Sequence, residues 1–131
     1  MKAIFLDIDG TLVSFKTHDI PASTIAAIKL AKENGHKIFI STGRPKAIIN
    51  NLGAIETYID GYVTMNGGYC FVGDQILHQS IIPANDVDNL AAYCKKNGKA
   101  VIFVQEHSIA VCQPDELVKN IEKKEINPLT Q

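Results

Sequence analysis

Residues 3–11 read Ala-Ile-Phe-Leu-Asp-Ile-Asp-Gly-Thr and give the strongest indication of the fold. Its first four residues are apolar. A short run that is apolar on both faces and ends in a glycine turn is typical of a buried strand in a parallel sheet. Asp7 and Asp9 follow at the carboxyl end of this strand, the edge at which open parallel sheets bind ligands. The stretch therefore predicts a sheet and the place of a polar site on it.

The chain up to residue 68 continues with alternating helix and strand patterns. Residues 21–34 have apolar side chains at helical spacing and stop before Gly35. Residues 37–41 form a second β-rich run, and Pro45 predicts a helix that extends to about residue 52. A third strand is expected over residues 62–65. This strand–helix alternation predicts the α/β class, with a parallel βαβαβ sheet and right-handed crossovers.

The pattern changes after residue 68. Residues 69–82 surround a Gly-Asp pair and predict a hairpin. A helix is expected over roughly residues 84–96, a second hairpin over 100–112, and a last amphipathic helix from Pro114 to about Lys124. We therefore expect a core domain over residues 1–82 and a smaller second domain over residues 83–131.

Charge and apolar patterning exclude several functions. The 131 residues include 13 basic and 14 acidic ones, so no excess charge favours nucleic acid. The apolar runs are far shorter than the roughly 20 residues of a membrane span, and Asp7 interrupts any signal peptide. Three widely spaced cysteines predict neither a disulfide framework nor a zinc site. We expect a cytoplasmic protein that binds neither nucleic acid nor a membrane.

Asp7 and Asp9 are the candidate catalytic residues. In such a pair one carboxylate can attack while the other stays protonated and donates to a leaving group. An aspartate nucleophile that forms an aspartyl-phosphate is a known covalent strategy. A lone Asp-x-Asp sequence more often caps a turn, so the spacing alone does not establish a catalytic pair.

Three blocks of sequence together resemble the haloacid dehalogenase (HAD) superfamily. Residues 5–12 (Phe-Leu-Asp-Ile-Asp-Gly-Thr-Leu) resemble its first motif, and residues 38–45 (Ile-Phe-Ile-Ser-Thr-Gly-Arg-Pro) resemble its second. Residues 64–68 (Thr-Met-Asn-Gly-Gly) are similar to the Asn-Gly element of the Cof-type subgroup, whose members insert a large cap after this strand. The resemblance implies a partial HAD-like, Rossmann-like core over residues 1–82 and the beginning of an α+β Cof-type cap over residues 83–131.

The resemblance also implies a role for each matching residue. Asp7 would be the nucleophile and Asp9 the general acid and base, while Mg²⁺ would bind the Asp7 carboxylate and the Asp9 backbone carbonyl. The implied function is Mg²⁺-dependent hydrolysis of small phosphorylated metabolites, such as sugar phosphates, through an aspartyl-phosphate. For Arg44, a contact with substrate or cap and a surface ion pair remain open alternatives. The residues implied to bind phosphate or substrate are Gly10, Thr42, Gly43, Arg44 and Asn66.

Two elements of the family are missing from the 131 residues: a lysine that contacts nucleophile and phosphate, and an acidic Gly-Asp-Gly-x-Asn-Asp motif. Both follow the cap in Cof-type proteins, so we expect a truncated chain with doubtful activity of its own. One alternative is an inactive remnant or a subunit that needs a partner chain. Another is a receiver-like phospho-acceptor, which would need an aspartate where this chain has Asn66. In the family's sheet order residues 3–6 would lie at an exposed edge, which predicts self-association.

Overall fold

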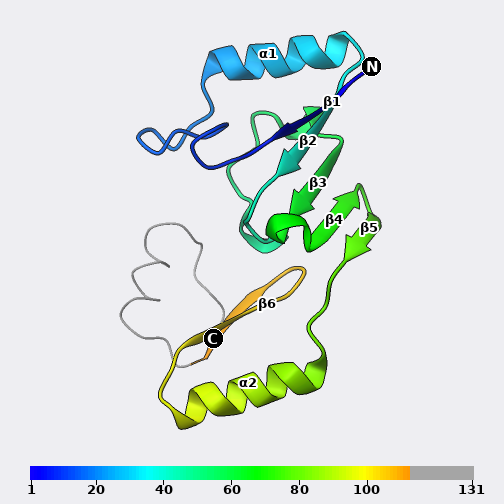
Figure 1. Ribbon diagram of the computed structural model, residues 1–131. Coiled ribbons are helices and arrows are strands. Elements are labelled where there is room, and N and C mark those ends of the chain that lie inside the picture. Colours follow the sequence, from blue (N-terminus) through cyan, green and yellow to red (C-terminus); the bar gives the residue numbers. More distant parts are fainter. Residues whose placement is uncertain (113–131) are drawn as a thin grey trace. The chain divides into compact units, whose positions relative to one another are not determined.

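The computed structural model describes residues 1–112 (Figure 1). It divides into two compact units, residues 1–45 with 49–80, and residues 46–48 with those from Ile81 onward. The assignment of residues 1–82 to a core domain and 83–131 to a cap domain stays a prediction. The helix predicted from Pro114 lies outside the described residues.

A five-stranded sheet in the order β1-β2-β3-β4-β5 forms the centre of the first unit. Its first three strands are parallel: β1 (Ala3–Leu6), β2 (Lys37–Ser41) and β3 (Gly61–Thr64). The hairpin of β4 (Tyr69–Val72) and β5 (Gln75–Gln79) extends the sheet in antiparallel fashion. Helix α1 (Ala22–Glu33) connects β1 to β2 and packs on the sheet (Figure 1). The predicted α/β class is confirmed.

The hydrophobic core lies between α1 and the sheet. Ile28 of α1 packs against Ile38 and Ile40, which alternate along β2 and are completely buried. Alternation with period two places such residues on one face of a strand. The turn after β1 and the loop before β3 complete the core with Ile8, Leu12, Val13, Leu52 and Ile55.

The helix predicted from Pro45 to residue 52 is wrong. The structure has only a 3₁₀ turn, Lys46–Ile48, and a second one at Glu56–Tyr58. The stretch before Gly53 is too short to compensate the cost of helix nucleation, and its β-branched and asparagine residues are weak helix formers. Burial of Leu52 and Ile55 in the core fixes the segment instead.

Strand β1 is not buried, although its apolar run predicted a buried strand. In the described part of the chain β1 pairs only with β2, so it is an edge strand, as the family's sheet order predicts. Ile4 and Leu6 are partly buried, but Phe5 is 56% exposed. Its ring stacks on that of Phe39, its partner in the register, with ring centroids 5.0 Å apart.

The second unit contains helix α2 and a two-stranded hairpin. Helix α2 (Ala84–Lys96) follows Pro83, and the hairpin consists of β6 (Val101–Val104) and β7 (Ile109–Cys112) in antiparallel pairing. These elements were predicted within a few residues, because Pro83 and Asn97-Gly98 mark the ends of the helix. Over residues 1–112, no helix has both the length and the apolar character to span a membrane.

Candidate active site

The turn after β1 carries Asp7 and Asp9 on a rigid base. The backbone N–H of Val13 donates to the Ile8 carbonyl at 2.9 Å, and the N–H of Gly10 donates to the Val13 carbonyl at 2.9 Å. Ile8 and Val13 are buried, whereas Asp7 and Asp9 are exposed. The turn therefore presents both carboxyl groups to solvent at the carboxyl end of β1.

Gly10 is required by the conformation of this turn. Its φ is +77°, in the left-handed region that favours glycine. A Cβ at this position would lie 2.5 Å from Cε2 of Phe15. The structure thus gives Gly10 a conformational role, and its contact with a substrate stays a prediction.

The loops after β2 and β3 are hydrogen-bonded to each other. Thr42 is 5% exposed, and its N–H donates to the Val63 carbonyl at 2.9 Å. The Asn66 N–H donates to the Thr42 carbonyl at 3.2 Å, and the Met65 N–H donates to the Arg44 carbonyl at 3.2 Å. These bonds hold Thr42, Arg44 and Asn66 in one cluster, although the sequence separates the two loops by about twenty residues.

Asn66 and Gly43 lie against each other within this cluster. Met65 and Asn66 both have φ of +53° and Gly67 has φ of +94°, a left-handed turn that asparagine and glycine tolerate best. A Cβ added at Gly43 would lie 3.2 Å from Asn66 Oδ1. Glycine at 43 therefore leaves room for the Asn66 side chain.

Arg44 reaches across to the first loop and binds Asp9. Its Nη2 donates to Asp9 Oδ1 at 2.6 Å and its Nε donates to Oδ2 at 2.8 Å, a bidentate ion pair. The Arg44 side chain is 18% exposed and that of Asp9 is 41% exposed. Of the two alternatives for Arg44, this structure shows an ion pair, and its partner is a predicted catalytic residue.

The ion pair keeps Asp9 ionised. Hydrogen bonds from Arg44 lower the pKa of the Asp9 carboxyl, partial burial opposes this, and the guanidinium charge lowers it further, so the net pKa lies below its ordinary value. Both carboxylate oxygens accept N–H groups in this pair. Asp9 therefore has no proton to donate while Arg44 holds it.

Sequence reasoning missed the pairing of Asp9 with Arg44. The two residues are 35 positions apart and no motif spacing connects them. The available signal was topological, because Asp9 follows β1, Arg44 follows β2, and these strands are parallel neighbours. Their carboxyl ends meet at one edge of the sheet.

The donor groups of the first turn fit Mg²⁺ in chemical type. Mg²⁺ prefers oxygen ligands and keeps several waters. The Asp7 carboxylate is exposed, and the bridge between Asp9 and Val13 uses the backbone groups of Ile8, Gly10 and Val13 rather than the Asp9 carbonyl. Within residues 1–112 no group of three or more His, Cys, Asp or Glu side chains could hold a metal ion. Mg²⁺ at this turn stays a prediction.

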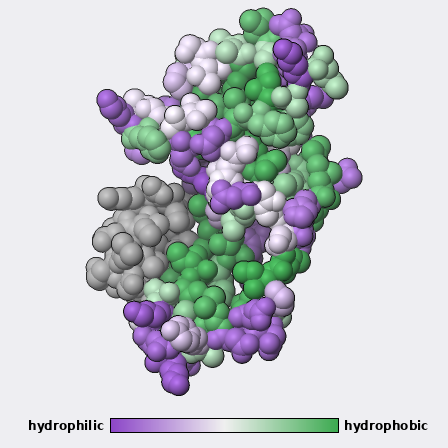
Figure 2. Space-filling view, in the orientation of Figure 1, coloured by the Kyte–Doolittle hydropathy of each residue, from purple (hydrophilic) through white to green (hydrophobic). Residues whose placement is uncertain are grey.

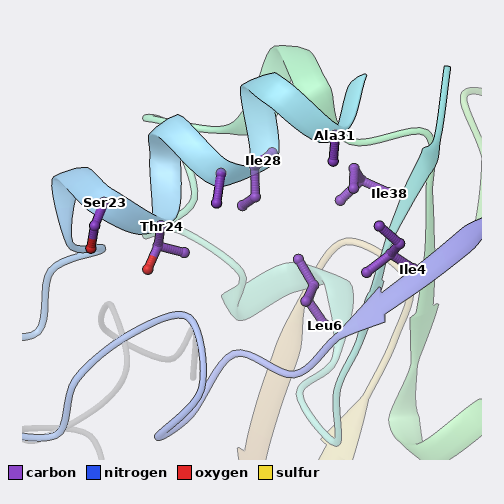
Figure 3. A pocket seen from close by; sticks show the side chains of 8 residues that line it. Ile4, Leu6, Ser23, Thr24, Ile28, Ala31 and Ile38 are labelled. Carbon is purple, nitrogen blue, oxygen red and sulfur yellow. The ribbon is translucent and has the colours of Figure 1, made fainter. Parts of the chain in front are cut away.

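An apolar hollow lies beside β1 and includes none of the cluster formed by Asp9, Thr42, Arg44 and Asn66. It has a volume of about 330 Å³ between α1 and the first two strands (Figure 3). Ile4 and Leu6 point into it from β1, and Ser23, Thr24 and Ile28 face it from α1. None of the predicted site residues lines this hollow, so it is a gap in the packing beside the edge strand rather than the site of phosphate chemistry.

The fold and these loops define a family. The chain belongs to the haloacid dehalogenase-like hydrolases, because the model of that family matches residues 4–130. The resemblance found in the three sequence blocks is thus confirmed. The receiver-like alternative is not favoured.

Particular relatives are known proteins of this kind. The chain is 56% identical to a solved structure of the HAD subclass IIB sugar phosphatase BT4131, with a TM-score of 0.86 over 98% of this chain and 51% of that one. It is 29% identical to BT1666 from Bacteroides thetaiotaomicron, an enzyme studied among HAD phosphatases, with a TM-score of 0.79 over 100% of this chain and 50% of that one. A Bacillus subtilis (strain 168) protein named "Putative phosphatase YkrA" is 29% identical over 87% of this chain and 44% of its own length. The chain thus spans about half the length of the relatives that it matches.

Proposed function

We propose that this chain carries the nucleophile-bearing half of a Mg²⁺-dependent phosphatase that acts on small phosphorylated metabolites, with sugar phosphates as the substrate class. The observation that carries the proposal is the connection of three loops at the carboxyl ends of β1, β2 and β3 through Asp9, Arg44, Thr42 and Asn66. An exposed Asp7 lies beside them in the first turn. The similarity to BT4131, described as a sugar phosphatase, supports the substrate class.

In the proposed reaction the Asp7 carboxylate attacks phosphorus. An aspartyl O–P bond forms and the ester O–P bond breaks. Asp9, which has first left Arg44 and taken up a proton from solvent, gives that proton to the leaving alcohol. Asp9 then takes a proton from the water that hydrolyses the aspartyl-phosphate. The Thr42 hydroxyl accepts the Arg44 N–H at 3.1 Å, which leaves its own proton for a phosphate oxygen.

Mg²⁺ would bind the Asp7 carboxylate and the Asp9 carbonyl. When bound, it offsets the repulsion between an anionic nucleophile and a phosphate dianion. Arg44 contributes positive charge at the same edge of the sheet.

Turnover of an aryl phosphate and of a panel of sugar phosphates with Mg²⁺ tests the proposal. The chain is assayed alone and after mixing with a separate polypeptide that corresponds to the part of BT4131 that this chain does not cover, since the chain spans about half of that protein. We expect Asp7→Asn to abolish turnover, because the amide cannot form the acyl-phosphate. Asp9→Asn should slow turnover by about 10²–10⁴-fold through loss of acid–base catalysis.

Near-normal turnover by the Asp7→Asn protein would contradict the mechanism. Turnover only in the presence of the second polypeptide would identify the chain as a subunit that needs a partner. Absence of turnover in both assays would leave the chain as an inactive remnant and overturn the proposal.

The proposed partners are small phosphorylated metabolites and a second copy of the chain. The near balance of basic and acidic residues supports a protein that does not bind nucleic acid. The exposed edge of β1 and the apolar hollow beside it support self-association. We also propose that the protein works in the cytoplasm and does not bind membranes.

A further inference from the structure

The backbone of Arg44 is held in place independently of Asp9. The Arg44 N–H donates to Thr42 Oγ1, and the Arg44 carbonyl accepts the N–H of Met65, so both neighbouring loops fix its backbone. Its side chain is the more buried of the pair, 18% exposed against 41% for Asp9. The anion is therefore the partner that solvent and ligands can reach.

Carboxylates and phosphates bind a guanidinium in the same way. Both accept parallel N–H groups from the planar fork of arginine. The Nε–H and Nη2–H of Arg44 now point at the two oxygens of Asp9. A phosphate oxygen cannot use these two groups while the Asp9 carboxylate occupies them.

We propose that Arg44 is a latch that exchanges Asp9 for the phosphate group of the substrate. Without ligand, Arg44 holds the Asp9 carboxylate by both oxygens. A phosphomonoester dianion carries more negative charge than a carboxylate and takes over the guanidinium, which releases the Asp9 side chain toward the substrate. This inference rests on the proposed phosphatase function, because it names the substrate group that operates the latch.

The latch predicts a specific coupling in anion binding. Binding of inorganic phosphate is measured by calorimetry at fixed pH and salt for the unchanged chain, Asp9→Asn, Arg44→Gln and the double variant. Removal of the competing carboxylate in Asp9→Asn should tighten phosphate binding by about threefold or more, the lower end of coupling between contacting residues. In the Arg44→Gln background the same Asp9→Asn change should give little or no gain, since the contested guanidinium is gone.

Asp19→Asn is the matched control for general charge. It removes another exposed carboxylate from the same loop between β1 and α1, so any gain from lower negative charge appears equally with and without Arg44. An Asp9→Asn gain of equal size in both backgrounds, or no larger than the Asp19→Asn gain, would overturn the latch. Failure of the Asp9→Asn protein to bind phosphate at all would overturn it as well.

A spectroscopic measurement follows the exchange in the unchanged chain. The ¹⁵N–¹H signal of Arg44 Nε should move on titration with phosphate, and Arg44→Lys should weaken the coupling because an ammonium is a point charge without the fork. Thermal unfolding of each variant shows that it is folded. None of these measurements needs turnover. If the Asp9→Asn gain in phosphate binding depends on Arg44 but the protein shows no turnover, the latch stands and only the phosphatase function is contradicted.

Discussion

At the level of single residues, two aspartates of the first unit hold ion pairs that differ in exposure. The Asp9 side chain is 41% exposed in its pair with Arg44, whereas the Asp60 side chain is 17% exposed. Asp60 Oδ2 accepts Lys32 Nζ at 2.5 Å and the Ile38 N–H at 2.8 Å, and Oδ1 accepts Lys37 Nζ at 3.0 Å. Asp60 thus joins the end of α1, the start of β2 and the loop before β3.

The pKa of Asp60 predicts how stability depends on pH. Burial raises the pKa of the Asp60 carboxyl, but hydrogen bonds from Lys32, the Ile38 N–H and Lys37 lower it by more. The net pKa therefore falls from 3.8 to about 2. A lowered folded-state pKa stabilises the fold above the unfolded pKa, and this contribution disappears as pH falls from about 4 toward 2. Asp60→Asn should cost about 2 kcal/mol near neutral pH, measured by urea unfolding.

The same unfolding series at lower pH provides the control. The difference between the unchanged chain and Asp60→Asn should shrink steadily below pH 4. A difference that stays constant down to pH 2 would show that the carboxylate charge does not stabilise the fold.

Gly10→Ala tests the turn that carries Asp7 and Asp9, the two proposed catalytic aspartates. An alanine at φ of +77° should cost about 1–2 kcal/mol through backbone strain. Gly35→Ala is the matched control, because Gly35 has φ of +75° and a Cβ there would meet nothing within 4 Å. Phe15 is 72% exposed, so its ring can move away and the two variants should lose similar stability in thermal unfolding. An unchanged melting temperature for Gly10→Ala would contradict the assigned role.

At the scale of elements, β3 positions the site by its closeness to β4. Gly61 is buried at the start of β3, opposite the end of β4. A Cβ at Gly61 would lie 2.9 Å from the Phe71 carbonyl oxygen and 2.8 Å from Cγ2 of Val72. The loop after β3 holds Thr42 and Arg44 through its backbone, so a displaced β3 also displaces the site.

We therefore expect Gly61→Ala to destabilise the first unit by about 1–3 kcal/mol, because a backbone oxygen cannot yield as a side chain can. Gly53→Ala is the control, since a Cβ at Gly53 would meet nothing within 4 Å and the change should be neutral or slightly stabilising. Chemical unfolding measures both variants. Equal effects of the two substitutions would refute the close packing of β3 against β4.

At the scale of the whole molecule, strand β1 stands out because one of its edges has no strand partner among residues 1–112. An edge strand exposes a row of backbone groups that can pair with another chain. Next to it are the exposed Phe5 and the apolar hollow under α1. Hydrophobic side chains reach the surface on the face shown in Figure 2 as well, between polar areas. Two-fold pairing of two β1 strands would bury the edge of each copy at once.

Sedimentation at micromolar concentration tests this self-association. The unchanged chain should sediment as a dimer or larger species, and Phe5→Lys should shift it toward the monomer, because lysine on an edge strand opposes pairing. Leu77→Lys is the control, since Leu77 is 59% exposed on β5, the opposite edge strand of the same sheet. A 14.3 kDa monomer for the unchanged chain would contradict the prediction.

Local sequence patterns were enough to predict the class of the fold, the family and the candidate site residues. Local patterns carry this information, because Asp7, Thr42 and the Asn-Gly pair at 66–67 each follow within two residues of the end of an apolar strand. Pro83 and the glycines likewise marked the ends of elements through their backbone preferences.

The contacts of each candidate site residue, in contrast, depend on how the strands are arranged in the folded chain. The ion pair of Arg44 with Asp9, the contact of Asn66 with Gly43 and the exposure of β1 depend on which strands are neighbours. The segment after Pro45 became a 3₁₀ turn rather than a helix because burial of Leu52 and Ile55 outweighed a weak local preference. Contacts between residues far apart in the chain have no local signature, so the arrangement of the sheet sets them.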